Sequence, residues 1–294
     1  MPSDLRTGRS IAVRAALDWG RQELSSSPTP ALDAQVLLAH ALGKPRAWVL
    51  AHDADLIGQR EHHIYASLIA RRVRGEPVAY LRGYVEWFGM ELEITPDVLI
   101  PRPETELVAE RAIKLARKEQ VLLVADIGTG SGALAIAMAR HLVTARVFAV
   151  DSSHAALGVA AKNVHKHGVA DRVTLVKGSL LTPLGEKPDL IVANLPYVAA
   201  GLMPSLERSV RFEPPDALCG GADGLELYAD MFDQMADRGW APHVVCEIDP
   251  RQAAGIRALA HRVFPDARVE VYPDYAVRDR IAQMRQPTSG VRSD

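Results

Sequence analysis

The sequence has little cysteine, no large excess of charge of either sign and no long apolar run. Its 294 residues include two cysteines, Cys219 and Cys246, which rules out a disulfide scaffold. Neither the cysteines nor the ten histidines show the spacing of metal ligands, so no metal site is expected. No segment reaches the roughly 18 to 20 apolar residues of a membrane span, and the N-terminus does not read as a signal peptide. We therefore expect a cytoplasmic protein that does not bind membranes.

Charge is nearly balanced, with 34 Lys and Arg against 36 Asp and Glu and a formal net charge of −2. Such a chain has no global basic field, so stable, direct binding of nucleic acid is not expected. With 48% hydrophobic and 24% charged residues, the composition is typical of a globular protein of one large or two modest domains. A monomer is the default expectation.

The pattern of apolar residues divides the chain into three parts. Residues 1–77 show helical spacing and no strand, which predicts a small all-helical N-terminal domain. Residues 78–99 mix aromatic residues with glycine and indicate a β-hairpin or an extended linker. Residues 100–294 form the third part, in which short apolar runs alternate with helical patterns.

These apolar runs predict a buried parallel sheet with helices on both faces. Five strands are expected at residues 121–126, 146–151, 173–177, 189–194 and 243–247. The tail after residue 265 reads as two more strands that form a hairpin at one edge. The predicted fold is therefore α/β with seven strands.

A glycine-rich loop separates the first of these strands from a helix that begins near Ala133. Its sequence is Asp126-Ile127-Gly128-Thr129-Gly130-Ser131-Gly132. Glycines allow a sharp turn and a close approach to a ligand, and the helix N-terminus offers free N–H donors. Asp151 ends the next strand, where a carboxylate can accept hydrogen bonds from both hydroxyls of a ribose.

Two nucleotide-type ligands fit this loop. The glycines also satisfy the dinucleotide fingerprint, which keeps an NAD-dependent oxidoreductase open. Asp126 and the third glycine favour S-adenosylmethionine, because its ammonium group needs an acceptor whereas a pyrophosphate disfavours a carboxylate. A turn that serves only helix packing is the remaining alternative.

The segment Asn194-Leu195-Pro196-Tyr197 follows the strand at 189–194, on the same sheet edge as the glycine loop. A planar nitrogen is a poor nucleophile, but the Asn194 side-chain oxygen and the Leu195 carbonyl can accept its hydrogens and orient it toward a methyl donor. Pro196 stiffens the loop, and Tyr197 can stack on a flat group. An ordinary β-turn is the alternative interpretation.

Together these motifs resemble class I, Rossmann-like methyltransferases that act on planar nitrogen. More specifically, the chain resembles the PrmC/HemK family of protein-(glutamine-N5) methyltransferases over nearly its whole length. The segments that carry this resemblance are Pro77–Tyr80, Gly89, Val98–Glu106, Glu213-Pro214 and Gly220–Leu225. The resemblance implies that the substrate is the glutamine of the Gly-Gly-Gln motif in bacterial class 1 peptide chain release factors. It also implies that the helical domain docks the release factor.

Carried over by position, the loop from Asp126 to Gly132 and Asp151 would bind S-adenosylmethionine and its product S-adenosylhomocysteine. The segment Asn194–Tyr197 would carry catalysis and hold the glutamine, and Asn194 would also contact the cofactor. Ser179 and Leu180 would contact the adenine, although the family has an acid followed often by an aromatic residue there.

A second departure is Leu195, since the family mostly has Asn-Pro-Pro-Tyr. The form Asn-Leu-Pro-Tyr is also that of ribosomal RNA adenine dimethyltransferases, so an N6-adenine methyltransferase acting on RNA or DNA is the alternative. A binding module without catalytic activity is a further alternative.

Three charged residues have two interpretations each. Arg102 and Glu104 open a predicted helix, where they could cap it or form a wall of the substrate site. Glu247 ends a strand at the same sheet edge as Asn194, and a solvated strand end is the expectation for it.

Overall fold

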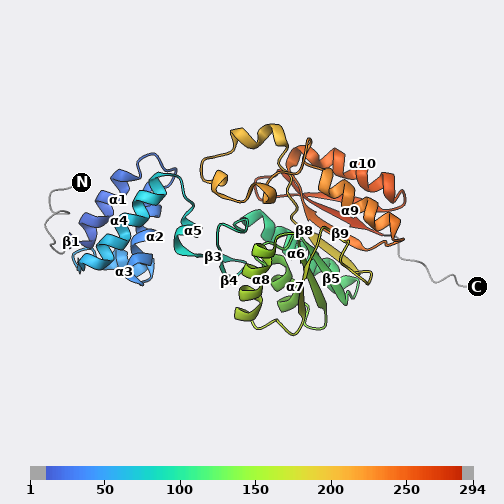
Figure 1. Cartoon of the computed structure of the whole chain (residues 1–294), viewed down its shortest axis with the longest axis horizontal. Coiled ribbons are helices and arrows are strands. Elements are labelled where there is room, and N and C mark those ends of the chain that lie inside the picture. Colours follow the sequence, from blue (N-terminus) through green and yellow to red (C-terminus); the bar gives the residue numbers. More distant parts are fainter. Residues whose placement is uncertain (1–10, 287–294) are drawn as a thin grey trace, which may run out of the picture. The chain divides into compact units, whose positions relative to one another are not determined.

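Two compact units make up the chain (Figure 1), and the computed structural model describes residues 11–286. The first unit contains the residues up to Gly83 together with Glu207–Phe212, and the second contains Tyr84–Leu206 and the residues from Glu213 onward. Among the helices within residues 11–286, none is long and apolar enough to cross a membrane.

The first unit is built mainly from helices, and α1, α2 and α4 pack against one another. Its helices are α1 (Val13–Glu23), α2 (Pro30–Leu42), α3 (Arg46–Ala51), α4 (Gln59–Val73), α5 (Val78–Arg82) and the 3-10 helix η3 (Val210–Phe212). Trp19, Leu37, Tyr65 and Ile69 belong to their common buried core. Burial of one face of each helix is what stabilises so short a bundle.

The expectation that this part of the chain contains no strand is wrong. Strands β1 (Ile11–Ala12) and β2 (Leu56–Ile57) form a two-residue antiparallel ladder. The sequence also does not predict α3 and α5, because five or six residues are too few to show a helical repeat of apolar positions.

The expected hairpin occupies the middle of its predicted segment. Strands β3 (Tyr84–Trp87) and β4 (Met90–Glu93) pair antiparallel across a turn of Phe88 and Gly89, whose φ angles are 49° and 66°. The preceding residues form α5, so the expectation of extended chain there is wrong. Pro77 immediately precedes that helix, and Gly83, with a φ of 79°, ends it.

The second unit contains the predicted seven-stranded sheet, with the order β10-β11-β9-β8-β5-β6-β7. Its strands are β5 (Leu123–Ile127), β6 (Arg146–Asp151), β7 (Val173–Lys177), β8 (Leu190–Ala193), β9 (His243–Glu247), β10 (Arg268–Pro273) and β11 (Asp279–Arg285). Strands β9, β8, β5, β6 and β7 run parallel, whereas β11 is antiparallel to both β9 and β10. The tail therefore forms the expected hairpin at one edge.

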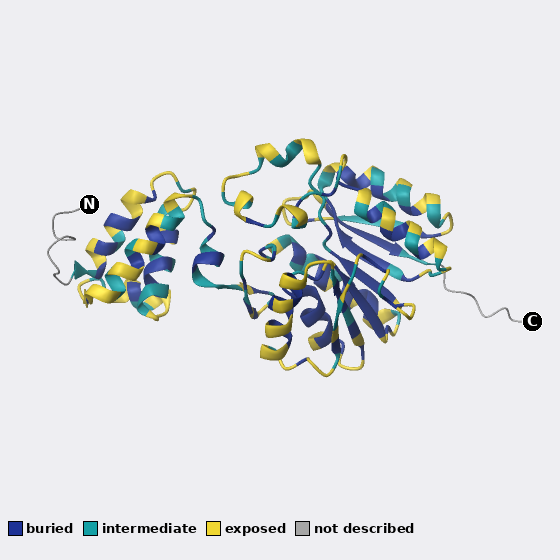
Figure 2. Cartoon of the chain, viewed as in Figure 1, coloured by how far each residue is buried: buried dark blue, intermediate teal, exposed yellow. Residues whose placement is uncertain are grey.

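Helices cover both faces of this sheet. The α-helices of this unit are α6 (Pro103–Lys118), α7 (Ala133–His141), α8 (His154–Lys166), α9 (Glu226–Asp237) and α10 (Ala253–Val263), and its 3-10 helices are η2 (Ala200–Ser205), η4 (Pro215–Ala217) and η5 (Pro250–Gln252). Contacts link α6 to α7 and α7 to α8, while α9 and α10 pack together (Figure 1). Every residue of β5 and β8 is buried, as is typical of central parallel strands (Figure 2).

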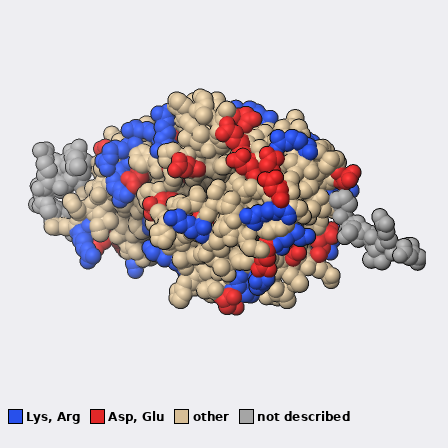
Figure 3. All heavy atoms as spheres, turned by 45° about the vertical axis from the view of Figure 1, so that its right-hand side comes forward, with Lys and Arg blue, Asp and Glu red and all other residues tan. Residues whose placement is uncertain are grey.

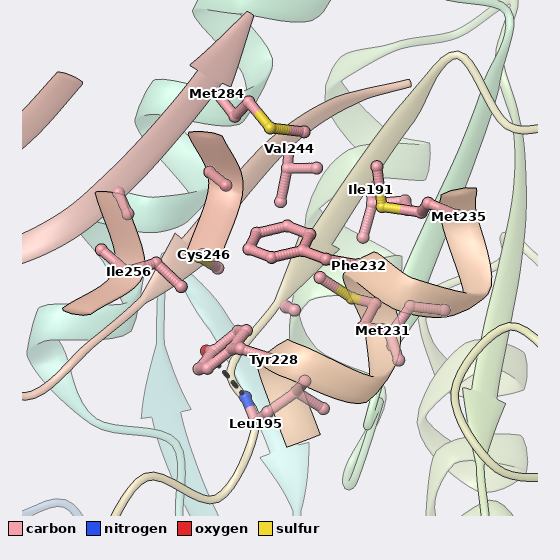
Figure 4. Packing of buried hydrophobic residues seen from close by; sticks show 14 of the residues in the cluster. Ile191, Leu195, Tyr228, Met231, Phe232, Met235, Val244, Cys246, Ile256 and Met284 are labelled. Atoms are coloured by element: carbon pink, nitrogen blue, oxygen red, sulfur yellow. Dashed lines mark hydrogen bonds between the residues drawn. The ribbon is translucent and has the colours of Figure 1, made fainter. Parts of the chain in front are cut away.

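The core beside α9 is rich in methionine and aromatic residues. Figure 4 shows Met231, Phe232 and Met235 of α9 packed toward Ile191 of β8 and Val244 of β9. This packing fixes the two strands whose carboxyl ends carry polar residues of the site described below.

Candidate active site

A cavity of about 400 Å³ lies at the carboxyl ends of β5, β6 and β8. These strands are adjacent and parallel, so their ends reach the same edge of the sheet. The predicted site residues that line the cavity are Gly128, Gly130, Asp151, Ser179, Leu180, Asn194, Leu195 and Pro196. The predicted site residues outside its lining are Asp126, Thr129, Ser131, Gly132, Tyr197, Arg102 and Glu104.

All three glycines of the loop between β5 and α7 have left-handed backbone conformations. Their φ angles are 74° at Gly128, 53° at Gly130 and 84° at Gly132, values that other residues rarely adopt. Gly128 and Gly130 lie on the cavity wall, where the backbone can approach a bound molecule closely. Gly132 packs against α8, and an added Cβ would lie 3.4 Å from the Cβ of Ala160. The loop thus combines close approach with helix packing.

The carboxylate of Asp126 is fully buried and holds the loop against α7. Oδ2 accepts hydrogen bonds from the Thr129 hydroxyl at 2.6 Å and the Ala135 amide at 2.9 Å, while Oδ1 has no partner among the described residues. Burial raises the pKa of this carboxyl to about 7. Ser131 is buried too, and its carbonyl accepts from the Asn163 side chain at 2.9 Å. A contact between Asp126 and a ligand's ammonium group stays a prediction.

Asp151 is fixed to the glycine loop on one side and to α8 on the other. Its Oδ2 accepts from the backbone amide of Gly130 at 2.9 Å, and its Oδ1 accepts from that of Ser153 at 2.8 Å. Each carboxylate oxygen has a further lone pair, so the group can still accept hydrogen bonds from a ligand. Asp151 thus lies at the end of β6 in the cavity lining, and its role as a ribose acceptor stays a prediction.

An apolar and strained turn forms the wall beyond β7. Ser179 and Leu180 line the cavity, and Leu180 has a φ of 51°, which is uncommon for a leucine. The Leu180 side chain is buried in the core cluster. Contact between these two residues and an adenine stays a prediction.

The charge of the cavity wall is negative. Asp97, Asp151 and Asp216 line it, and the described lining contains no Lys, Arg or His. The sequence reasoning does not single out Asp97 or Asp216. The available signal is their position beside segments that carry the family resemblance, since Asp97 precedes Val98–Glu106 and Asp216 follows Glu213-Pro214.

Asn194 lines the cavity, and only one end of its side-chain amide has a hydrogen-bond partner. Its Nδ2 donates to the Thr105 hydroxyl at 3.1 Å. Its Oδ1 is buried and has no hydrogen-bond partner within residues 11–286. A buried acceptor without a partner is unfavourable by about 1–3 kcal/mol, and a bound N–H donor would remove that penalty.

Glu247 is not a solvated strand end, and that expectation is wrong. The residue is 1% exposed, because α6 and the loop after β8 cover the end of β9. Its Oε2 accepts from the Thr105 hydroxyl at 2.6 Å and its Oε1 from the Tyr197 hydroxyl at 3.1 Å. Burial raises the pKa of the Glu247 carboxyl, and the two hydroxyls act in the opposite direction.

Tyr197 and Leu195 each have a hydrogen-bond partner outside the cavity lining. The hydroxyl of Tyr197 is committed to Glu247, and burial raises the pKa of this phenol. The amide of Leu195 donates to the buried Tyr228 hydroxyl at 3.3 Å. The Leu195 side chain is 3% exposed and packs near Gly128, so it supports the glycine loop.

Arg102 and Glu104 have partners away from the cavity lining. Arg102 is the residue before α6 and forms an ion pair with Glu213, a carboxylate that also accepts from the Ile100 amide at 3.0 Å. Glu104 lies in the first turn of α6, 3.8 Å from the guanidinium of Arg278. Both positions fit the interpretation that these residues cap the start of α6. A role in binding a substrate stays a prediction.

The strand order, the glycine loop and the polar segment after β8 define the class of this protein as a Rossmann-like, class I methyltransferase. A solved structure described as "hMettl16 catalytic domain in complex with MAT2A 3'UTR hairpin 6" is similar with a TM-score of 0.55. The two sequences are 16% identical over 76% of this chain and 81% of that one, a likeness that shows the fold alone.

Two family models match parts of the chain. The model described as "PrmC N-terminal domain" matches residues 15–83, which lie in the helical unit. The model described as "Ribosomal protein L11 methyltransferase (PrmA)" matches residues 104–214, which include the glycine loop and Asn194.

Relatives that are similar over most of their length define the family. The release factor glutamine methyltransferase of Moorella thermoacetica is 40% identical over 274 residues, which cover 92% of this chain and 97% of that protein. The enzyme of the same name from Bacillus subtilis is 36% identical over 277 residues, covering 90% of this chain and 94% of that protein. The chain therefore belongs to the family of release factor glutamine methyltransferases, as the sequence motifs indicate.

Proposed function

We propose that this protein transfers a methyl group from S-adenosylmethionine to the side-chain nitrogen of the glutamine in the Gly-Gly-Gln motif of class 1 release factors. The observation that carries this proposal is the amide oxygen of Asn194, which is buried, lacks a partner and belongs to a residue of the cavity wall. A primary amide supplies the N–H donor that this oxygen needs. The family of the chain supplies the identity of the substrate.

The cavity suits a positively charged nucleoside. Asp151 would accept from the two ribose hydroxyls, and Gly128 and Gly130 allow close approach of the backbone. Three aspartates and the absence of a basic side chain from the described lining favour the ammonium and sulfonium groups of S-adenosylmethionine. The same charges disfavour the pyrophosphate of NAD, which is the ligand of the oxidoreductase alternative.

The residues after β8 would act by orienting the substrate nitrogen. The cofactor supplies a methyl group bound to a positively charged sulfur. Asn194 Oδ1 would accept one hydrogen of the glutamine amide and the Leu195 carbonyl the other, which turns the nitrogen toward that methyl group. Transfer would form the nitrogen–carbon bond while the donor's carbon–sulfur bond breaks, and the electron pair of that bond would remain on sulfur. The nitrogen then loses a proton to water, so we assign no general base.

The helical unit would hold the release factor during this reaction. This role rests on the resemblance and on the match of residues 15–83 to the PrmC N-terminal domain. We expect a cytoplasmic enzyme that acts as a monomer. Asp126 and the buried loop residues would support the cofactor indirectly, and Arg102 and Glu104 stay candidates for a substrate wall.

The second candidate function is N6-methylation of adenine in RNA or DNA, because an exocyclic base amine could use the same acceptors. Binding of nucleic acid depends on Lys and Arg that neutralise phosphates. On the face drawn in Figure 3, acidic and basic side chains are interspersed, and the net charge of the chain is −2. These charges favour a protein substrate.

A competition between acceptors tests the proposal. Purified protein is incubated with labelled S-adenosylmethionine, a release factor and total RNA in one reaction, and the label is counted in each fraction. We expect label in the release factor, and none when Asn194→Ala replaces the wild type. Label in RNA alone would overturn the proposal in favour of adenine methylation.

A further inference from the structure

The chain contains two asparagines, and their side-chain amides are held differently. Both ends of the Asn163 amide are bonded: Oδ1 accepts from the Glu93 amide at 2.7 Å, and Nδ2 donates to the carbonyls of Glu93 and Ser131 at 3.0 and 2.9 Å. Asn194 has a partner only for Nδ2, which donates to Thr105. The orientation of the Asn194 amide therefore depends on which end Thr105 binds.

The hydrogen-bond capacity of Thr105 settles that orientation. A threonine hydroxyl has one hydrogen to donate, and here it donates to Glu247 Oε2 at 2.6 Å. An ionised carboxylate only accepts, so the bond cannot run in the other direction. With its hydrogen committed, Thr105 can only accept from Asn194, and this requires Nδ2 rather than Oδ1 to face it.

Three groups around Glu247 favour its ionised form, namely the hydroxyls of Thr105 and Tyr197 and the guanidinium of Arg280. Tyr197 donates its hydroxyl hydrogen to Oε1, so both carboxylate oxygens accept. Arg280 is 8% exposed and also favours the charged form, whereas burial, which has the largest effect on the pKa of Glu247, and the Glu104 carboxylate on α6 oppose it. The side chains that hold Asn194 in this network come from separate segments. Asn194 follows the end of β8, Tyr197 lies in the loop after it, Thr105 is in the first turn of α6, and Glu247 ends β9.

We propose that Thr105 and Glu247 are positioning residues that fix the orientation of the Asn194 amide, so that Oδ1, and not Nδ2, is the end left to accept from the substrate. Neither residue lines the cavity, so they act through Asn194. In the opposite orientation Nδ2 would face the substrate amide, and two N–H donors would repel each other. This inference rests on the proposed function, since it deepens the role of Asn194 in holding a planar nitrogen.

Nuclear magnetic resonance on protein labelled with ¹⁵N-asparagine tests the orientation without any substrate. Two side-chain amide pairs are expected, and the pair of Asn163 serves as an internal reference. Thr105→Val keeps the shape and removes the hydroxyl, so the Asn194 pair should move upfield and exchange faster with water. Thr105→Ser keeps the hydroxyl and should leave the pair near its wild-type position. Identical Asn194 signals in the two variants would overturn the proposal.

A kinetic comparison of the same variants tests the consequence for catalysis. Thr105→Val is expected to lower kcat for methyl transfer to the release factor by about 10- to 100-fold, and Thr105→Ser to recover most of it. The dissociation constant for S-adenosylmethionine should stay unchanged, because Thr105 does not contact the cavity. Equal kcat values for the two variants would contradict a positioning role.

The resonance and kinetic experiments together distinguish a failure of the positioning role from a failure of the proposed function. If the wild type transfers nothing to a release factor, the proposed function fails, and the resonance experiment still decides whether Thr105 orients Asn194. If the wild type is active and Thr105→Val loses cofactor binding along with activity, Thr105 supports the fold of the cavity and the positioning role is wrong.

Discussion

The backbone amide of Leu195 donates to the hydroxyl of Tyr228 (Figure 4), and the same hydroxyl donates to the main-chain oxygen of Glu247 at 2.5 Å. One buried side chain of α9 thus joins the chain that follows β8 to the end of β9. The Asn-Pro-Pro-Tyr form typical of the family has no amide hydrogen at the position of Leu195. The leucine therefore supplies a hydrogen bond that a proline there could not make.

Tyr228→Phe should destabilise the protein by about 1–3 kcal/mol, because it leaves the Leu195 amide and the Glu247 carbonyl without this partner. The free energy of unfolding in urea measures the effect. Tyr275→Phe is the matched control, since Tyr275 is 87% exposed. Equal stability of the two variants would show that the Tyr228 hydroxyl adds nothing to the fold.

Asp151→Ala should weaken binding of S-adenosylmethionine by about 10- to 100-fold. The substitution removes the proposed ribose acceptor and also the acceptor of the Gly130 amide. Calorimetric titration of the cofactor gives the dissociation constant directly. Asp237→Ala, which removes an exposed carboxylate at the end of α9, should bind the cofactor as the wild type does. An unchanged affinity in Asp151→Ala would remove Asp151 from the cofactor site.

The buried Asp126 makes stability depend on pH. Its pKa is raised from 3.8 to about 7, chiefly by burial, so between those values the folded protein holds a proton that the unfolded chain has released. This contribution to stability is present at low pH and is lost as pH rises toward 7. Relative to the wild type, Asp126→Asn should therefore gain roughly 2–3 kcal/mol of unfolding free energy between pH 5 and pH 7.5. Parallel pH profiles for the two proteins would show that Asp126 does not titrate in this range.

Arg102→Ala should destabilise the fold by about 1–3 kcal/mol, because it leaves the buried carboxylate of Glu213 without its cation. The loss should be smaller in a Glu213→Gln background, where no charge needs the guanidinium. If Arg102→Ala also raises the KM for the release factor, the residue belongs to the substrate wall. If it binds the cofactor and methylates the release factor as the wild type does, the role of Arg102 is structural.

Long and regular elements of the fold follow from the sequence. The run 146–151 matches β6 residue for residue, because its four central residues are apolar, as is typical of an inner parallel strand. The helix after Arg102 follows from Pro103 at its start and the acids of its first turn. Helices α3 and α5 and the β1–β2 ladder do not follow, since helices of five or six residues are too short to show a repeat and strands of two residues are too short to show an apolar run.

The cavity residues on the glycine loop and after β8 are also predictable, because each follows directly on a strand of a parallel sheet. The residues that hold these cavity residues in place are not predictable from the sequence. Thr105 and Glu247 are separated by 142 positions, and only the packing of α6 on the end of β9 brings them to 2.6 Å. Glu247 looks like a solvated end because a sequence does not show which strand ends the helices cover.

The most direct test of the proposed activity is methyl transfer to a purified release factor beside its Gly-Gly-Gln→Gly-Gly-Asn variant. Labelled S-adenosylmethionine supplies the methyl group, and mass spectrometry of the peptide that contains the motif locates it. We expect label on the side-chain nitrogen of that glutamine in the wild-type factor and none in the variant. Equal labelling of both factors, or no labelling while the cofactor still binds, would contradict it.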